Sequence, residues 1–312
     1  MTGVQAGKVG VVHAAVLQRP SWVGAWIHAC RIPTLTASVV PVLVGTALAW
    51  RHEASRPLAA LAALVGAVAI QIGTNLANDL YDFRKGADAP GRTGPPRVLP
   101  EGWLSGGEVR TGMIVSFAIA TVAGLYLWKV AGWPVVAIGT VSIAAGIGYT
   151  AGPFALAYVG LGDLAVLLFF GFVAVIGTYY VQARAVHPEA VLAAIPVGAL
   201  ATAILIVNNV RDIDRDRAAG KRTLAVILGR RGARAEFLAL LIAAYAVPLG
   251  LWAQGLRSAW ILLPFATGSL AMRALHAVRE REDGPALNRA LLDTARLHAL
   301  FGILFAAGIA LG

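Results

Sequence analysis

The sequence predicts an all-α membrane protein with about nine transmembrane helices around a central cavity that is capped by polar segments on the cytoplasmic side. Two observations predict this class. Hydrophobic residues make up 58% of the 312 residues and charged residues only 13%, with a mean hydropathy of +0.72, whereas a soluble domain averages about 25% charged residues. Apolar stretches of about 20 residues, the length that spans a bilayer, also recur along most of the chain. The composition therefore disfavours a soluble enzyme.

The apolar stretches follow one another after a polar N-terminal extension, residues 1–24, which is expected to be cytoplasmic. The first thirty residues lack the apolar core and small-residue cleavage site of a signal peptide. The membrane domain is expected to cover residues 25–312. Its nine spans are expected at 33–50, 58–80, 111–129, 133–151, 163–182, 189–210, 235–254, 258–275 and 292–311.

The distribution of basic residues predicts the orientation of the chain. Of the 26 Lys and Arg residues, 21 lie in the N-terminal segment, after the second and sixth spans, and around the connection between the eighth and ninth. Because cytoplasmic loops are enriched in Lys and Arg, we expect a multi-pass protein of the cell membrane (inner or plasma) with its N-terminus inside and its C-terminus outside. The net charge of +10 then requires no nucleic-acid partner.

Metal-binding patterns based on Cys or His are not visible in the sequence. The single cysteine, Cys30, excludes an internal disulfide and makes a structural zinc site implausible. The six histidines show no spacing typical of metal ligands.

The two longest connections, roughly 81–110 and 211–234, lie on the expected cytoplasmic side and are predicted to be polar loops. An acidic cluster lies where each begins. The first runs from Asn75 to Asp88, and the second runs from Asn208 to Arg222. Carboxylates are costly near the membrane and often mark functional sites. The clusters hold six of the sixteen acidic residues: Asp79, Asp82, Asp88, Asp212, Asp214 and Asp216.

The spacing within each cluster favours binding of a divalent cation. Residues four apart share a helix face, so Asn78 and Asp82 point one way, and so do Asp212 and Asp216. Mg²⁺ prefers oxygen ligands and is commonly held by one or two carboxylates together with substrate phosphates. Two such half-sites predict a pair of metals that clamps a diphosphate. Asp214 points elsewhere on a helix and is either a supporting group or only a loop charge.

Glycines and basic residues complete the pattern. Gly86 and Gly220 follow the two clusters at the same offset, which predicts a turn after each and indicates two related half-sites that face each other. The alternative is a set of interfacial, solvated ion pairs, which fits one cluster better than it fits two on the same side. The candidates for direct contact with phosphate oxygens are Arg84, Lys85, Arg211, Lys221 and Arg222.

These motifs resemble the two aspartate-rich motifs of the UbiA-type intramembrane prenyltransferases. The likeness extends from about residue 25 to the C-terminus. Within the superfamily it is greatest to the branch that prenylates 1,4-dihydroxy-2-naphthoate in menaquinone synthesis. The supporting strings are Asn208-Asn-Val-Arg-Asp212, Gly148-Tyr-Thr-Ala-Gly-Pro153, Gly160-Leu-Gly-Asp163 and Gly177-Thr-Tyr-Tyr180. One departure is the segment before the first span, which keeps Arg31 but lacks the second basic residue that is usual in the family.

The resemblance implies a reaction. A polyprenyl diphosphate binds with Mg²⁺ at both motifs and ionises to an allylic cation, which the ring of 1,4-dihydroxy-2-naphthoate attacks. Loss of CO₂ then gives demethylmenaquinol and diphosphate. The expected catalytic residues are Asp79, Asp82, Asp212 and Asp216, and the expected metal ligands are Asn78, Asp82, Asp88, Asp212 and Asp216. The expected substrate-binding residues are Arg31, Asn75, Lys85, Tyr149, Thr150, Asp163, Asn208, Arg211 and Lys221.

Some assignments stay open. An allylic cation needs a dry cavity and is attracted to aromatic faces. The candidate aromatic neighbours are Tyr149, Phe169, Phe170, Tyr179 and Tyr180. Ordinary packing explains any single one of them better, except that the resemblance implies a place for Tyr149 and Thr150 near the diphosphate. Asp163, expected near the cytoplasmic end of the fifth span, either orients the aromatic acceptor or stabilises a loop.

Two other functions compete with naphthoate prenylation. One is a UbiA-type enzyme for another acceptor, such as 4-hydroxybenzoate, homogentisate or a chlorin. The hydroxybenzoate branch implies a Tyr-Pro-x-x-Lys string after the fourth span, where this chain has Tyr149-Thr-Ala-Gly-Pro153. The other is a divalent-cation transporter, which predicts carboxylates in mid-span, whereas the acids here gather at one membrane face.

Overall fold

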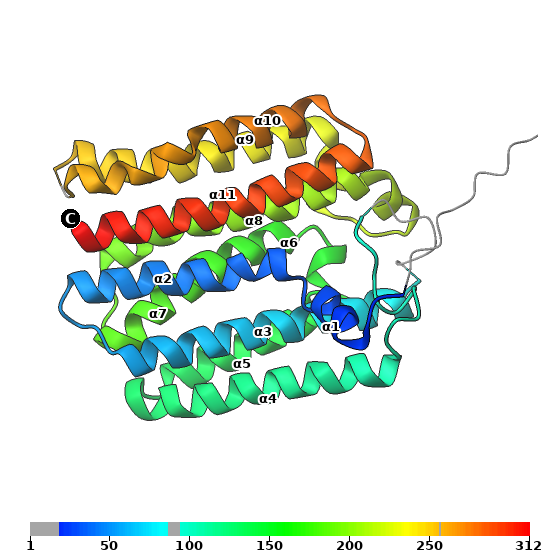
Figure 1. Ribbon diagram of the computed structural model, residues 1–312, viewed down its shortest axis with the longest axis horizontal. Coiled ribbons are helices and arrows are strands. Elements are labelled where there is room, and N and C mark those ends of the chain that lie inside the picture. The colour runs from blue at the N-terminus through cyan, green and yellow to red at the C-terminus, as the bar shows by residue number, and fades with distance from the viewer. Residues whose placement is uncertain (1–18, 87–93, 256) are drawn as a thin grey trace, which may run out of the picture.

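The computed structural model describes residues 19–86, 94–255 and 257–312, and within them the chain is entirely helical (Figure 1). Most helices run side by side along one axis of the bundle. The elements are α1 (Trp22–Cys30), η1 (Ile32–Leu35), α2 (Thr36–Arg51), α3 (Pro57–Arg84), α4 (Gly106–Ala131), α5 (Pro134–Gly148), η2 (Leu156–Tyr158), α6 (Gly162–Val166), η3 (Leu167–Val173), α7 (Ala174–Ala183), α8 (Pro188–Ala218), α9 (Leu224–Ala253), η4 (Ala259–Thr267), α10 (Gly268–Glu280) and α11 (Gly284–Leu311).

Within these residues, the nine expected spans are confirmed. Eight helical segments are long and apolar enough to cross a membrane, and the ninth, α5, is a shorter apolar helix. Three of the spans are built from consecutive pieces, namely α1–η1–α2, α6–η3–α7 and η4–α10. The expected N-terminal extension lies mostly outside the described residues, and α1 begins at Trp22.

Helix α8 is the most enclosed of the spans and packs against α9, α11, α7 and η3. Close approach of η3 depends on two glycines. A Cβ on Gly171 would lie 2.8 Å from the Gly198 Cα, and a Cβ on Gly198 would lie 2.9 Å from the Gly171 Cα. Small residues let helix backbones approach closely inside a membrane, where packing replaces the hydrophobic drive between helices. The contact holds η3, which lines the cavity described below, against α8.

The prediction of a long polar loop at 211–234 is wrong. Helix α8 continues to Ala218 and α9 begins at Leu224, so only five residues connect them. The charged side chains near the end of α8 interrupt its hydrophobic sequence, but they do not break the hydrogen bonds of the helix. The helix therefore continues beyond its hydrophobic segment. Gly220 ends it with a φ of 70°, and Gly86 adopts 69° after α3. The turns expected at both glycines are confirmed, and the acids of the two clusters that lie in the described residues, Asp79, Asp82, Asp212, Asp214 and Asp216, stand on helices α3 and α8.

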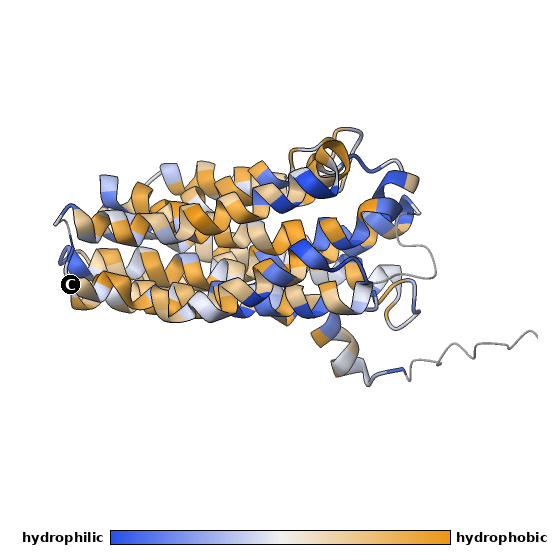
Figure 2. Cartoon of the chain, turned by 90° about the horizontal axis from the view of Figure 1, so that it is seen from above, coloured by the Kyte–Doolittle hydropathy of each residue, from blue (hydrophilic) through white to orange (hydrophobic). Residues whose placement is uncertain are grey.

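Polar residues gather at the end of the bundle where α3 and α8 finish (Figure 2). We call this the aspartate-rich end. The C-terminus lies at the opposite end (Figure 1). The bundle is therefore hydrophobic along its middle and polar at the aspartate-rich end, as expected for a protein that spans a membrane.

Candidate active site

A cavity of about 750 Å³ extends into the bundle from the aspartate-rich end. Helix α3 forms one wall and contributes residues from Ala63 to Asp82. At the aspartate-rich end the walls carry carboxylates, amides and cations, and farther in they are formed by apolar groups such as Leu127, Val135 and Val181. The cavity therefore joins a charged chamber to an apolar one.

The first acidic cluster lines the charged chamber as its helical spacing predicts. The Asn75 amide donates to the Cys30 carbonyl at 3.0 Å and to the Thr34 hydroxyl at 3.3 Å, which fixes η1 beside α3. The Asn78 side-chain oxygen accepts a 3.0 Å hydrogen bond from Thr150. The side-chain amides of Asn75 and Asn78 thus hold neighbouring segments in place around the carboxylates of α3.

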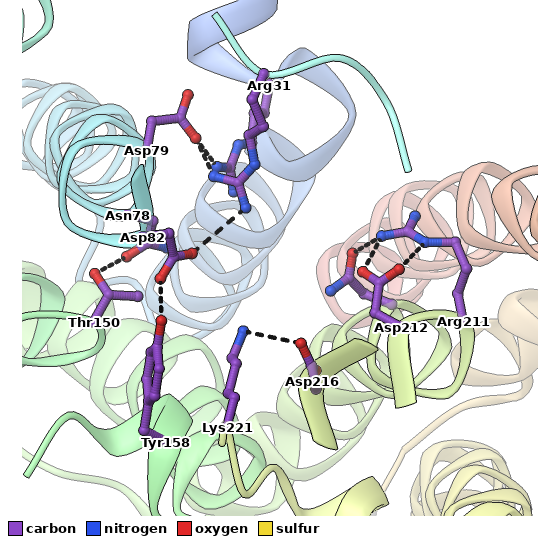
Figure 3. Close-up of polar contacts among 12 residues, drawn as sticks. Arg31, Asn78, Asp79, Asp82, Thr150, Tyr158, Arg211, Asp212, Asp216 and Lys221 are labelled. Carbon is purple, nitrogen blue, oxygen red and sulfur yellow. Dashed lines mark hydrogen bonds and ion pairs between the residues drawn. The ribbon is translucent and has the colours of Figure 1, made fainter. Parts of the chain in front are cut away.

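Asp79 and Asp82 are held by cations and a phenol. Asp79 forms ion pairs with both Arg31 and Arg97 and is 2% exposed. Asp82 accepts a 2.9 Å hydrogen bond from the Tyr158 hydroxyl and lies 3.7 Å from the Arg97 guanidinium. Figure 3 shows the guanidinium group of Arg31 facing the Asp79 carboxylate. Two guanidinium groups therefore stand at the first cluster, where they can also bind an anion.

In the second cluster, Arg211 is the central group. Its guanidinium binds Asp212 through two contacts of 2.9 and 2.6 Å and also donates to Asn208 at 2.7 Å and to Asn288 at 2.8 Å. The Arg211 side chain is only 1% exposed. Arg211, Asn208 and Asn288 line the cavity, so this cation serves as an internal partner that fixes Asp212 and joins α8 to α11.

Asp216, one turn after Asp212, carries an unused buried oxygen. Its Oδ1 lies 3.9 Å from the Lys221 ammonium, whereas Oδ2 is buried and has no hydrogen-bond partner within the described part of the chain. In Figure 3, Lys221 and Asp216 lie between the Asp82–Tyr158 pair and the Asp212–Arg211 pair. A buried carboxylate oxygen without a partner is costly, and a divalent cation would satisfy it. The donor set therefore fits Mg²⁺.

Two lysines flank the ring of Tyr158. Lys85 donates to the carbonyls of Thr150 at 2.7 Å and Gly152 at 3.1 Å, and its ammonium lies 4.3 Å from the ring centroid. Lys221 approaches the same ring to 5.5 Å. Because the negative face of an aromatic ring attracts cations, Tyr158 keeps both ammonium groups beside Asp82.

Tyr149 and Asp163 both line the cavity. A Cβ at Gly162 would lie 3.0 Å from the Tyr149 hydroxyl, so the glycine lets this phenol approach α6. Asp163 is 4% exposed, and its Oδ2 has no hydrogen-bond partner among the residues with a described structure. An unsatisfied carboxylate oxygen beside a phenol is suited to receive a hydroxyl of a bound ligand.

Other candidates lie away from the cavity. Arg84 is exposed and stacks over the Tyr81 ring at 5.8 Å, and Arg222 is exposed. Asp214 is exposed and pairs with Arg217 and Arg230 at 3.3 and 2.7 Å, as its helical position implies. Asp88 lies outside the described residues.

Of the aromatic candidates, Tyr149, Phe169 and Phe170 line the cavity. Tyr179 and Tyr180 do not. They lie at the opposite end, where the Tyr179 hydroxyl contacts His52 at 2.8 Å and the Tyr180 hydroxyl donates to the Ala131 carbonyl at 3.2 Å.

Sequence reasoning did not single out Arg97 and Tyr158 as site residues. Arg97 lies in the segment between α3 and α4, and Tyr158 is the last residue of the short helix η2. Neither segment carries an aspartate motif, and the fold alone brings both residues to Asp82. A weak signal for Arg97 was available, because it is one of the basic residues between the second and third spans.

Carboxylates and cations that open into a long apolar chamber, within a bundle of membrane helices, are suited to a molecule that combines an apolar chain with an anionic head. Comparison with known proteins gives the family. The family model of the UbiA prenyltransferase family matches residues 38–310. The chain belongs to this family and is a prenyltransferase.

Relatives of this chain share most of its length. It is 38% identical over 299 residues to 1,4-dihydroxy-2-naphthoate octaprenyltransferase of Escherichia coli (strain K12), covering 94% of this chain and 97% of the relative. It is 33% identical over 285 residues to the octaprenyltransferase of the same description from Bacillus subtilis (strain 168), covering 88% and 89%.

Solved structures share the fold. A UbiA homolog from Archaeoglobus fulgidus bound to GPP and Mg²⁺ superposes with a TM-score of 0.63 at 15% identity, covering 90% of this chain and 99% of that one. The apo structure of a UbiA homolog from Aeropyrum pernix K1 gives a TM-score of 0.65 at 18% identity, covering 87% and 97%.

Replacing Arg97 by Met tests the residue that the sequence did not reveal. We expect KM for the prenyl diphosphate to rise about tenfold, because a charged hydrogen bond to an anion contributes about 1.5–3 kcal/mol and Arg31 remains. Steady-state kinetics with varied diphosphate would measure this. Arg110→Met, on the exposed start of α4, is the control. An unchanged KM in Arg97→Met would contradict a role in diphosphate binding.

Proposed function

We propose that this enzyme transfers an all-trans polyprenyl group from polyprenyl diphosphate to 1,4-dihydroxy-2-naphthoate, with release of CO₂ and diphosphate, and that it requires Mg²⁺. The observation that carries the proposal is the cavity itself, in which one continuous space joins Asp79 and Asp82 to an apolar chamber. Asp212 and Asp216 do not line this space, but they pair with Arg211 and Lys221, which do. A polyprenyl diphosphate has the same division into a charged head and an apolar tail.

The charged chamber is suited to hold the diphosphate between the two clusters. Arg31, Arg97 and Lys221 line it and can donate to phosphate oxygens. Asn78 and Asp82 on α3 and Asp212 and Asp216 on α8 are the groups that would hold Mg²⁺, with the open Oδ2 of Asp216 as the clearest ligand atom. When bound, Mg²⁺ neutralises charge on the leaving diphosphate.

The apolar chamber is suited to protect the allylic cation that remains when the carbon–oxygen bond breaks. Phe169 and Phe170 line it from η3. Their rings offer a negative face to a cation, and the apolar walls exclude the water that would otherwise capture it. The electron pair of the broken bond leaves with the diphosphate.

The acceptor would lie between the two chambers. In the proposed step a ring carbon of the naphthoate forms a bond to the prenyl carbon, and the bond to its carboxylate breaks to release CO₂, so the substitution needs no external oxidant or proton source. The open Oδ2 of Asp163 and the nearby Tyr149 hydroxyl are placed to bind the acceptor hydroxyls. The names of the two relatives above support this acceptor.

A single assay tests the reaction and the acceptor together. The purified enzyme in lipid nanodiscs would be incubated with geranylgeranyl diphosphate and dihydroxynaphthoate, with Mg²⁺ or with excess chelator. Mass spectrometry of the product should show one added prenyl group and the loss of CO₂, only when Mg²⁺ is present. Product formed from 4-hydroxybenzoate or homogentisate instead would reassign the acceptor, and no product from any acceptor would overturn the proposal.

Replacing Asp163 by Asn tests the acceptor side. We expect kcat/KM for dihydroxynaphthoate to fall about tenfold to a hundredfold, since the hydrogen bond to a charged acceptor group is weakened, while KM for the prenyl diphosphate changes little. Varying each substrate at saturation of the other separates the two effects. Equal changes for both substrates would favour a purely structural role for Asp163. Asp293→Asn, on α11 outside the cavity lining, is the control.

We also infer that the aspartate-rich end faces the cytoplasm, because 21 of the 26 Lys and Arg residues lie in the N-terminal segment and in the connections and helix ends on that side. Reporter fusions to the C-terminus test this. Alkaline phosphatase should be active and green fluorescent protein dark if Gly312 is external. The opposite pair of results would reverse the orientation.

A further inference from the structure

A second cluster of ligating side chains lies at the end of the bundle opposite the aspartate clusters. His52 follows the last residue of α2, His187 precedes α8, and Glu189 is in the first turn of α8. One ligand atom from each residue lies within 4.8 Å of the others. Glu189 and Asp216 are separated along α8 by 27 residues, roughly 40 Å at 1.5 Å per residue, so this cluster is independent of the diphosphate site.

Two hydrogen bonds hold the His52 ring in an orientation that suits a metal ligand. Its Nε2 lies 3.0 Å from Oε2 of Glu189, and its Nδ1 lies 2.8 Å from the Tyr179 hydroxyl. Two ligands bound side by side to one ion at about 2.0–2.1 Å are themselves separated by about 3 Å. A metal-bound imidazole usually donates its other N–H to a neighbouring oxygen, which fixes the ring, and the Tyr179 hydroxyl is in that position.

His187 completes the group from the solvent side. Its ring centroid lies 4.5 Å from that of His52, and its side chain is exposed. One ring nitrogen accepts a 3.3 Å hydrogen bond from the Glu189 backbone N–H, a long contact that a small rotation of the ring would exchange for a metal bond. The cluster is thus open to ions from the aqueous phase.

We propose that His52, His187 and Glu189 bind a transition-metal dication such as Zn²⁺, with water in the remaining position. Two imidazoles and one carboxylate suit zinc, and imidazole is a ligand for Zn²⁺, Cu²⁺ and Ni²⁺ rather than for Mg²⁺. The site differs in this way from the oxygen-only set at the aspartate-rich end.

One neighbouring charge opposes the ion. Arg257 forms an ion pair with Oε2 of Glu189, the same oxygen that contacts His52. An ion bound between His52 and Glu189 would therefore share Oε2 with Arg257 or displace the guanidinium from it. The guanidinium charge lowers the affinity for a dication, so we expect reversible binding rather than a permanently held structural zinc.

A bound ion would connect three helices of the bundle. His52 belongs to the end of α2, His187 and Glu189 to the start of α8, and Tyr179 to α7, whose Thr178 and Val181 line the cavity. The sequence gives no sign of this cluster, because 135 residues separate His52 from His187. Only the packing of α2 against α8 brings the two histidines together.

The test is a metal titration of the purified, chelator-treated enzyme in detergent, with Mg²⁺ in excess to occupy oxygen sites. Isothermal titration calorimetry with Zn²⁺ should show one saturable site, and Co²⁺ should give the visible absorption of an imidazole-bound ion. His187→Ala, an exposed position, should weaken Zn²⁺ binding at least tenfold. His276→Ala, on the exposed face of α10, should leave it unchanged.

Two results would overturn the proposal. One is the absence of a saturable Zn²⁺ site in the native enzyme. The other is equal Zn²⁺ affinity in the native enzyme and in the His187→Ala variant. Neither result depends on prenyl transfer, so the outcome is independent of the proposed reaction.

Discussion

Replacing Asp82 by Asn is expected to lower kcat for prenyl transfer about a thousandfold, the size of effect seen when one group that stabilises a developing charge is removed. Asp82 lines the charged chamber between Tyr158 and Arg97. An amide at this position still accepts the hydrogen bond from Tyr158, so the fold should persist. The loss would then report the missing negative charge. Single-turnover product formation, with circular dichroism to check the fold, measures both.

The matched control for Asp82→Asn is Asp214→Asn. Asp214 belongs to the second acidic cluster and also pairs with arginines, yet it is exposed and lies outside the cavity lining. Its replacement should leave kcat within about twofold of the native value, as expected for an exposed ion pair. Equal and mild losses in both variants would contradict the assignment of the cavity as the active site.

Replacing Asp216 by Asn is expected to lower kcat about a hundredfold without reducing stability. Oδ2 of Asp216 is buried and has no hydrogen-bond partner in the described structure, and Lys221 approaches Oδ1 only to 3.9 Å, so a neutral amide removes a weakly compensated charge from the interior. The melting temperature should stay the same or rise, whereas the Mg²⁺ concentration needed for half-maximal activity should increase. A large fall in melting temperature would instead indicate a structural role.

Substitution of Asp212 is a less direct test of catalysis, because this residue also forms a buried ion pair that the sequence does not predict. Its helical position predicts only a cavity-facing carboxylate, which leads to the expectation that Asp212→Ala would stop turnover and leave the protein folded. In the structure Asp212 holds the guanidinium of Arg211, which is 1% exposed. Removing one partner of a buried pair costs about 3–5 kcal/mol, so loss of activity in Asp212 variants would combine chemistry with instability.

The sequence was sufficient for the features that repeat along a helix. Hydropathy predicted the spans because a bilayer selects for length and apolar character at every crossing. The four-residue spacing of Asn78 and Asp82 was sufficient to place them on one cavity wall. Gly86 and Gly220 marked the helix ends because their backbone angles, with φ of 69° and 70°, strongly favour glycine.

Features that depend on contacts between distant segments could not be predicted. Arg97 and Tyr158 reach Asp82 across 15 and 76 residues of chain, and no local pattern encodes those contacts. Tyr179 and Tyr180 follow a motif of the family resemblance, but the direction of α7 carries them to the far end of the bundle. The prediction of a long loop at 211–234 was wrong for a different reason. Hydropathy reports where a helix leaves the membrane and says nothing of where it ends.

The length of the cavity has a consequence for how tightly the substrate binds. Along α3 it extends from Ala63 to Asp82, roughly 28 Å at 1.5 Å per residue, which is close to the thickness of the hydrocarbon core of a bilayer. A polyprenyl tail that enters from the membrane therefore exchanges one apolar surrounding for another. Since lipid tails are as apolar as the cavity walls, that transfer contributes little free energy, and affinity must come from the diphosphate. Inorganic diphosphate with Mg²⁺ should for this reason be a strong competitive inhibitor, although it lacks the greater part of the substrate.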